Sequence, residues 1–313
     1  MPHDRKFRFG VMASRAASAK EYREQAKLAE DVGFTTLFVP DHFVDHPFAP
    51  FPAMAMIAEA TNLRVGPLVL GNDYKHPVVL AREAATLDLL SEGRLELGIG
   101  AGWMTADYEK AGLQLDRPTV RIARLAESIN VLKGLWSDSP FTFHGEHYRI
   151  TDLDGQPKPV QQPHPPIIVG GGGKKVLSLG AREAQIVGIN ANLRRGEAND
   201  PDAAQSATGA ATDQKLDWVR EAAGDRYDDL EIQQFVGFVH FTDDRMSFAN
   251  AMAPAFGVEP DVALETPLVL VGSIESMIDD LLARRERWQM SYIVVNADFA
   301  EQLAPLVAKL AGT

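Results

Sequence analysis

Short apolar runs alternate with longer amphipathic segments along nearly the whole chain, and this alternation limits the fold more than any other feature. Eight runs predict buried strands, at residues 7–12, 36–39, 65–70, 94–99, 167–169, 186–189, 232–240 and 292–295. The segments that follow them predict helices, at residues 18–32, 53–60, 77–90, 119–136, 174–180, 213–223, 274–287 and 299–310. A repeated strand–helix unit implies a parallel sheet, so eight units predict an α/β fold, the closed (β/α)8 barrel of the TIM type.

Local signals mark where the first helix begins and ends. Ser18 followed by Glu21 forms a capping box, and Gly33 is suited to stop the helix. An open, doubly wound sheet is the main alternative fold, but it would place a glycine fingerprint directly after the first strand. Residues 10–14 read Gly-Val-Met-Ala-Ser and do not supply that fingerprint, so we favour the barrel.

Two stretches depart from the repeat and predict insertions after strands four and six. Residues 141–150 alternate in polarity around a His-Gly-Glu turn, which indicates a hairpin, and a proline-rich connector follows. Residues 194–212 are polar and aperiodic, which predicts a mobile loop or lid at the carboxyl end of the barrel. We expect residues 1–313 to form a single barrel domain.

The composition excludes several kinds of site and partner. The 313 residues include no cysteine, so the chain forms no disulfide, thiolate metal site or cysteine nucleophile. A net charge of -12, with no offsetting basic cluster, opposes binding to nucleic acid and to anionic membrane surfaces. No apolar run approaches the roughly 20 residues of a membrane span. Since no basic-then-apolar leader opens the chain, we expect a cytoplasmic protein.

Several motifs lie at or near the predicted strands in a fixed order. They are Gly33-Phe34, Val39-Pro40-Asp41-His42, Arg64-Val65-Gly66, Leu90-Ser91-Glu92-Gly93-Arg94-Leu95, Leu97-Gly98-Ile99-Gly100-Ala101-Gly102-Trp103, Pro165-Pro166-Ile167-Ile168-Val169-Gly170-Gly171 and Val271-Gly272-Ser273. Together they resemble the luciferase-like monooxygenase superfamily, especially its deazaflavin-dependent branch. The resemblance covers most of the chain and implies a coenzyme at the carboxyl ends of the strands, where a barrel places its active site.

A run of four glycines, Gly170, Gly171, Gly172 and Gly173, joins strand five to a helix. Glycine allows close backbone approach, and the free N–H groups of the helix start suit a phosphate. The resemblance places the coenzyme phosphate here as well, whereas an ordinary strand-to-helix turn is the plain alternative.

Asp41 and His42 follow strand two and match a pair that lies beside the ring in deazaflavin enzymes of this family. Histidine can give or take a proton near neutral pH, so His42 is the catalytic candidate. Adjacent residues in an extended segment point opposite ways, so we expect Asp41 and His42 to have separate functions. His46 nearby invites a metal interpretation with this pair, but we expect no metal site.

Further coenzyme contacts follow from the resemblance. Leu68 and Val69 match the family site of a non-prolyl cis peptide that backs the coenzyme ring. Gly100, Ala101 and Gly102 end strand four, where missing side chains would clear room for a flat ligand, with a crowded barrel interior as the alternative. Trp103 is predicted to line the substrate pocket. A glutamate acid matches that position in a sugar-phosphate dehydrogenase branch, so tryptophan argues against that substrate.

Three functions remain open on the sequence. The first is hydride transfer between a deazaflavin (coenzyme F-420) and a small organic substrate, which the Asp41–His42 pair favours. The second is a monooxygenase that uses oxygen and reduced flavin mononucleotide (FMN). A separate coenzyme reductase would supply the reduced flavin. The third is a flavin-binding barrel without turnover. A metal hydrolase is disfavoured because strand one carries no His-x-His pair. A homodimer is a further expectation.

Overall fold

The computed structural model describes residues 5–13, 15–197 and 200–313. Its main sheet consists of parallel strands β1 (Arg8–Met12), β2 (Thr36–Val39), β3 (Arg64–Pro67), β4 (Leu70–Gly71), β5 (Leu97–Gly100), β8 (Ile167–Gly171), β9 (Ile186–Ile189), β10 (Glu231–Val236) and β13 (Met290–Asn296). Their order is β3-β2-β1-β13-β10-β9-β8-β5-β4. Strands that are adjacent in this sheet are also consecutive barrel strands along the chain. The exception is the pair of β1 and β13, the first and last barrel strands, which closes the barrel.

The third barrel strand is interrupted between its two halves. β3 pairs with β2, and β4 pairs with β5. The peptide bond between Leu68 and Val69, which joins the halves, is cis, as the resemblance implies. A parallel bridge between Val65 and Leu95 connects β3 to the segment before β5. With β3 and β4 counted as one strand, the sheet is the predicted (β/α)8 barrel.

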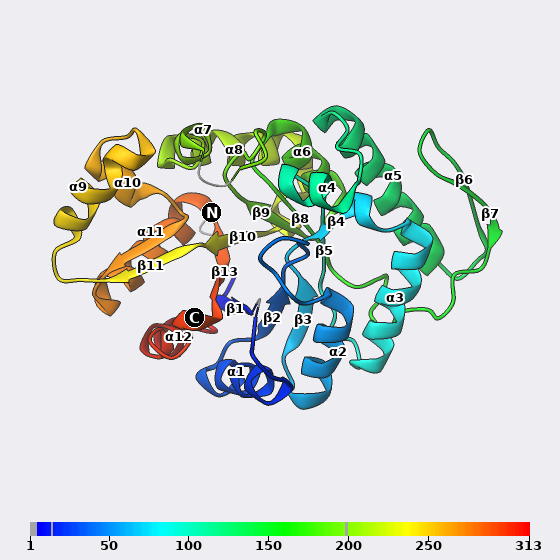
Figure 1. The fold of residues 1–313 in the computed structure, drawn as a ribbon, viewed down its shortest axis with the longest axis horizontal. Coiled ribbons are helices and arrows are strands. Elements are labelled where there is room, and N and C mark those ends of the chain that lie inside the picture. Colours follow the sequence, from blue (N-terminus) through cyan, green and yellow to red (C-terminus); the bar gives the residue numbers. More distant parts are fainter. Residues whose placement is uncertain (1–4, 14, 198–199) are drawn as a thin grey trace.

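The barrel strands lead into helices that form a ring around them in Figure 1. These helices are α1 (Ala19–Val32), α2 (Pro50–Ala60), α3 (Pro77–Leu90), α5 (Pro118–Trp136), α6 (Lys174–Glu183), α8 (Gly209–Ala223), α11 (Ile274–Trp288) and α12 (Ala304–Leu310). The predicted signals around α1 are confirmed, because Ser18 caps its first turn and Gly33 follows its end with a φ of 99°. No helix in the described part of the chain has the length and hydropathy that crossing a membrane requires.

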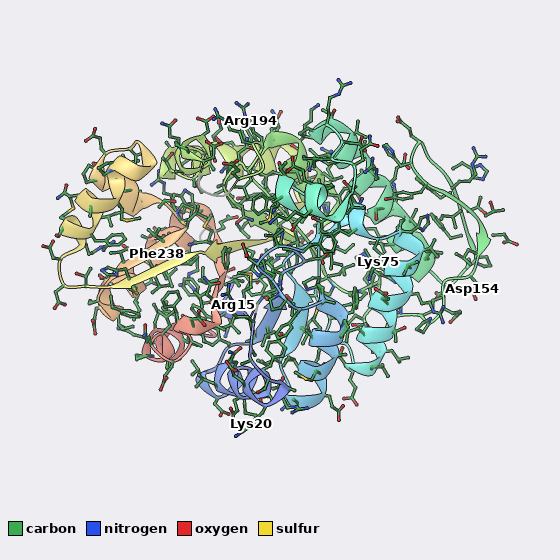
Figure 2. The ribbon with its side chains drawn as sticks, in the orientation of Figure 1. Arg15, Lys20, Lys75, Asp154, Arg194 and Phe238 are labelled. Carbon is green, nitrogen blue, oxygen red and sulfur yellow. The ribbon has the colours of Figure 1, made fainter. Side chains whose placement is uncertain are left out.

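The insertion after strand four is a hairpin, as predicted. Strands β6 (Phe141–His144) and β7 (Arg149–Leu153) pair antiparallel and project beyond α5, with Asp154 directly after β7 (Figures 1 and 2). A short helix that the sequence did not predict, α4 (Thr105–Ala111), lies between β5 and α5.

The insertion after strand six is more regular than predicted. The described residues of the 194–212 stretch include the short helix α7 (Pro201–Gln205), and α8 begins at Gly209 instead of residue 213. Asp200 and Thr208 cap these two helices through their side chains. Such side-chain caps satisfy free backbone N–H groups, so a polar composition here encodes helix starts as well as loop. Residues 198 and 199 lie outside the described residues.

A third insertion, after strand seven, is missing from the sequence prediction. The predicted strand at 232–240 is two strands, β10 and β11 (Phe238–Phe241), separated by Gly237. β11 pairs in parallel with β12 (Val269–Gly272), and helices α9 (Arg245–Phe256) and α10 (Pro260–Glu265) connect them. Figure 1 shows this unit on the side of the molecule away from the hairpin, and Figure 2 labels its Phe238.

Charged side chains close the amino end of the barrel. The Arg8 guanidinium donates to Glu96 and Glu231 at 2.5–2.7 Å, and Arg64 donates to the same Glu96 carboxylate at 2.7 Å. The Tyr292 hydroxyl donates to Glu96 at 2.9 Å. Burial raises the pKa of the Tyr292 phenol, and the Glu96 carboxylate adds to the effect. These contacts connect charged and polar groups from five different strand regions at this end.

Candidate active site

The carboxyl ends of the strands bring the predicted site residues to one face of the barrel. Asp41 and His42 follow β2, Leu68 and Val69 lie between β3 and β4, and the segments 100–103 and 170–173 lie at the ends of β5 and β8. Parallel strands in a closed barrel place these ends together, at the face where barrel enzymes carry their active sites.

His42 has a carboxylate partner that sequence reasoning missed. Its Nδ1 lies 2.6 Å from Oδ2 of Asp107, whose side chain is fully buried on α4. The other oxygen of Asp107 accepts from the backbone N–H groups of Phe43 and Val44, at 2.9 and 3.0 Å. The hydroxyl of Tyr74 donates to Oδ2 at 3.2 Å. Asp107 therefore holds both the imidazole ring and the loop that carries it.

The ring of His42 lies between two aromatic side chains. Its centroid is 5.5 Å from that of Trp103, edge to face, and 5.3 Å from that of His46. Burial, together with the nearby His42, lowers the pKa of the His46 imidazole. Trp103 thus lies at the site, next to the catalytic candidate.

Asp41 has a hydrogen-bond partner of its own, different from that of His42. Its Oδ2 accepts the backbone N–H of Gly71 at 3.1 Å, at the end of the interrupted third strand. Burial raises the pKa of the Asp41 carboxyl, while the Gly71 hydrogen bond opposes that shift. Asp41 and His42 also line the head of a groove of about 1050 Å³ that runs between α2 and α3 as far as Leu90.

The glycines at the end of β5 make room for protein rather than for an open space. A Cβ on Gly98 would lie 2.1 Å from the carbonyl oxygen of Pro67, and one on Gly100 would lie 2.8 Å from Val69. A Cβ on Gly102, whose φ is +74°, would lie 2.0 Å from the hydroxyl of Tyr108. A crowded barrel interior, the alternative that the sequence did not exclude, therefore accounts for these glycines. Because they lack side chains, the Leu68–Val69 peptide can lie close against β5.

The four glycines at the end of β8 fall into two pairs. A Cβ on Gly171 would lie 2.4 Å from Val176, and one on Gly172 would lie 2.2 Å from the carbonyl oxygen of Ala191. A Cβ on Gly170 would lie 3.4 Å from its nearest atom, and one on Gly173 would lie 3.9 Å from its nearest atom. Both of these atoms are side-chain nitrogens. Gly171 and Gly172 are therefore needed for packing, whereas Gly170 and Gly173 leave space at the site.

The start of α6 fits an anion. Gly173 is its N-cap and provides no side-chain cap, so the first N–H groups of the helix have no capping partner from that residue. A helix start with free N–H groups and a positive dipole end suits a phosphate. Lys174 is paired with Glu221 at 3.0 Å, so its charge is partly compensated.

A buried amine holds the base of the insertion after β9. Nζ of Lys215 donates to the carbonyl oxygen of Asn190 at 2.7 Å and to that of Ser206. Burial lowers the pKa of this amine to about 8. The backbone N–H of Asn192 donates to the Ser206 hydroxyl at 2.7 Å. Lys215 thereby connects the two ends of residues 190–206, the segment after β9 that passes the glycine loop.

Comparison with known proteins identifies the family. The family model described as luciferase-like monooxygenase matches residues 6–288. This chain belongs to that family. The resemblance inferred from the motifs is thereby confirmed.

Curated relatives within the family divide between two coenzymes. An FMNH(2)-dependent dimethylsulfone monooxygenase of Pseudomonas putida is 31% identical over 45% of this chain and 39% of its own. An F-420-dependent glucose-6-phosphate dehydrogenase of Amycolatopsis mediterranei is 34% identical over 48% of this chain and 47% of its own. The matches thus span about half or less of the length of these curated relatives.

Solved structures match over nearly the full length. The coenzyme F-420-dependent tetrahydromethanopterin reductase of Methanopyrus kandleri superposes with a TM-score of 0.78 at 17% identity, covering 98% of this chain and 99% of the other. A long-chain alkane monooxygenase superposes with a TM-score of 0.73 at 14% identity, covering 97% and 92%. At these identities the likeness establishes the barrel fold alone.

Proposed function

We propose that this chain is an oxidoreductase that transfers a hydride between a deazaflavin, coenzyme F-420, and a small organic substrate. The observation that carries the proposal is the 2.6 Å contact between His42 and Asp107 at the barrel mouth. Reduction of a carbonyl compound adds a hydride to carbon and a proton to oxygen, and oxidation of an alcohol removes both. An oriented histidine can supply or accept that proton.

His42 is arranged for such a transfer. Asp107 accepts a hydrogen bond from Nδ1–H, which leaves Nε2 as the atom that exchanges a proton. Nε2 has no hydrogen-bond partner among the described residues, and the side chain of His42 is 17% exposed. In the reducing direction Nε2 gives its proton to the substrate oxygen, and the buried carboxylate stabilises the imidazolium before that step.

The coenzyme would be held by residues from four strand ends. Its phosphate would bind at Gly170 and Gly173 before α6, and Gly171 and Gly172 would set the path of that loop. The ring would rest against the Leu68–Val69 peptide near Asp41 and the 100–102 segment, Gly100, Ala101 and Gly102. When bound, the deazaflavin supplies or accepts the hydride, and Trp103 beside His42 would wall the substrate pocket.

A second candidate is an FMN-dependent monooxygenase that receives reduced flavin from a separate reductase. The similarity to dimethylsulfone monooxygenase favours this function, and the same loops would serve either coenzyme. A flavin-binding barrel without turnover is the remaining alternative. We favour F-420 because the His42–Asp107 pair provides the proton transfer that a hydride couple requires.

Titration with both coenzymes, followed by absorbance, tests the proposal. We expect deazaflavin to bind at least tenfold more tightly than FMN, and its absorbance to change on adding carbonyl or alcohol substrates. Oxygen uptake with reduced FMN would select the monooxygenase instead, and binding without any turnover would select the non-catalytic barrel.

We also propose that the chain forms a homodimer. Val79, Leu89 and Leu90 are exposed on α3, and α2 beside it has one charged residue, Glu59. The groove between these helices is a surface that a second copy can cover. Sedimentation of wild type and Leu90→Glu would test this assembly, because a charge on the exposed apolar surface of α3 should shift the protein toward monomer.

A further inference from the structure

Two adjacent glutamines on β10 are both buried but face opposite sides of the strand. Gln234 faces away from the barrel interior, and its Nε2 donates to the carbonyl oxygen of Pro267, whereas its Oε1 is buried without a partner among the described residues. Gln233 is 1% exposed, yet its Nε2 is buried without a hydrogen-bond partner among the described residues. The alternation of side chains along a strand places Glu231, Gln233 and Phe235 on one face, and Glu231 binds Arg8 inside the barrel. Gln233 therefore points into the barrel.

The partners of Gln233 on the next two strands toward the glycine loop are glycines. Gly188 is its partner on β9, and Gly170 is the partner of Gly188 on β8. A Cβ on Gly188 would lie 3.5 Å from Oε1 of Gln233 and 3.3 Å from the Cα of Gly170. The Nδ2 atom of Asn190 lies 3.4 Å from a Cβ built on Gly170. Two glycines and a carboxamide thus form a flat row across three strands, beside the glycine loop.

The polar side chains next to this row, toward the amino end of the barrel, do have hydrogen-bond partners. Tyr292, the neighbour of Gln233 on β13, donates to Glu96, which also binds Arg8 and Arg64. That network provides no hydrogen-bond partner for Nε2 of Gln233 among the described residues. A buried amide without a partner is costly, and native proteins usually pair such groups with protein, water or ligand.

We propose that the Gln233 carboxamide binds the pyrimidinedione edge of the coenzyme ring. A carboxamide presents a donor beside an acceptor and complements an edge in which an N–H lies beside a carbonyl oxygen. Deazaflavins and flavins both carry that edge, so the inference does not depend on which of them the protein uses. It does rest on the proposed function, since it requires a coenzyme of this class. Gly170 and Gly188 leave a flat surface over which such a ring can reach the amide.

The paired glutamines provide a matched experiment. Gln233→Met keeps the size of the side chain and removes both polar groups, and Gln234→Met does the same on the outer face. Coenzyme affinity is measured by absorbance or fluorescence titration with F-420 and with FMN, and stability by the thermal midpoint without ligand. We expect Gln233→Met to weaken binding at least tenfold without lowering the midpoint. We expect Gln234→Met to lower the midpoint and keep affinity within about threefold.

The outcomes separate this inference from the proposed function. If wild type binds F-420 or FMN and Gln233→Met binds it equally well, the inference is wrong and the proposed function stands. A lower midpoint for Gln233→Met, with unchanged affinity, would show an amide that serves the fold or a trapped water. If wild type binds neither coenzyme, the proposed function fails and the inference fails with it. Gln233→Leu provides a second variant, for which we expect the same loss of affinity.

Discussion

The two ends of the barrel differ in how completely the protein satisfies their polar groups. At the amino end, Arg8, Arg64 and Tyr292 converge on Glu96, and Glu231 takes a further pair of hydrogen bonds from Arg8. Further along β10, the buried Nε2 of Gln233 has no partner among the described residues, and at the carboxyl end Gly173 leaves α6 without a side-chain cap.

The difference separates stability from function within one fold. Polar groups that the protein itself satisfies hold strands together, whereas groups left without protein partners remain available to a ligand. Substitutions at the amino end should therefore change the free energy of unfolding. Substitutions at the carboxyl end should change binding or rate while the fold persists.

The largest effect is expected at Glu96. Glu96→Gln removes the carboxylate shared by two arginines at a 2% exposed position, so it leaves buried positive charge without its counter-ion. We expect a loss of about 3–5 kcal/mol in the free energy of unfolding, measured by urea denaturation. Glu24→Gln, which breaks the exposed pair with Lys20, is the control and should cost under about 1 kcal/mol. Equal losses of unfolding free energy in Glu96→Gln and Glu24→Gln would show that the amino-end network stabilises the fold no more than an exposed ion pair does.

The next effect is on the rate of hydride transfer. His42→Ala should lower it by about 10²-fold or more while coenzyme affinity stays within about tenfold, because the proton donor is lost but the phosphate site is not. Single-turnover absorbance separates the two quantities. His42→Gln should fail equally, since it keeps a hydrogen bond without a titratable group.

Asp107→Asn sharpens the same test. The imidazole should lose the partner that orients it, so the rate should fall and the pH dependence of the remaining activity should shift. A native rate in His42→Ala would show that His42 only lines the pocket, and that water or another group supplies the proton.

A smaller effect is expected at the glycine loop. Gly173→Val places a side chain in open space before α6, at a φ of -108° that valine readily adopts. We expect at least a tenfold loss of coenzyme affinity, because the side chain would lie in front of the helix N–H groups. Gly172→Val is unsuitable for this test, because its side chain would displace the Ala191 backbone. Unchanged affinity in a folded Gly173→Val would refute the phosphate site.

The smallest effect is expected in the insertion after β9. Arg194 and Arg195 are exposed there, and Figure 2 labels Arg194 on this side of the molecule. We expect coenzyme to slow trypsin cleavage at these residues several-fold, because ligand binding should order the segment. Cleavage at Arg149, which is exposed on the hairpin, is the internal control and should not change. Equal protection at both places would argue against a lid.

Much of the framework was predictable because its signals are local. The eight strand positions, the helices after them, the Ser18 cap and the hairpin are encoded within short segments. The insertion after strand seven was missed because the residues around Gly237 form a continuous apolar run. A run of that kind does not show that one strand ends and another sheet begins.

The candidate site was predictable only in part. Its strand-end residues follow from the barrel, since parallel strands bring their carboxyl ends together. Asp107 was missed because α4 is short and the residue is separated from His42 by 65 positions. A carboxylate in the first turn of the helix that follows a glycine-rich strand end is the signal that could have suggested it.

The sequence by itself determined the barrel, its family and the segments that reach its active face, because strand and helix periodicity are properties of neighbouring residues. Only the tertiary structure decided which polar groups are satisfied. Gln233 and Gln234 are the same residue type in adjacent positions, yet the amide nitrogen of Gln234 has a carbonyl partner and that of Gln233 has none among the described residues, although the Oε1 of Gln234 is itself buried without one. Their difference depends on Pro267, Gly188 and Gly170, which lie far away in the chain and meet the glutamines only after the barrel has closed.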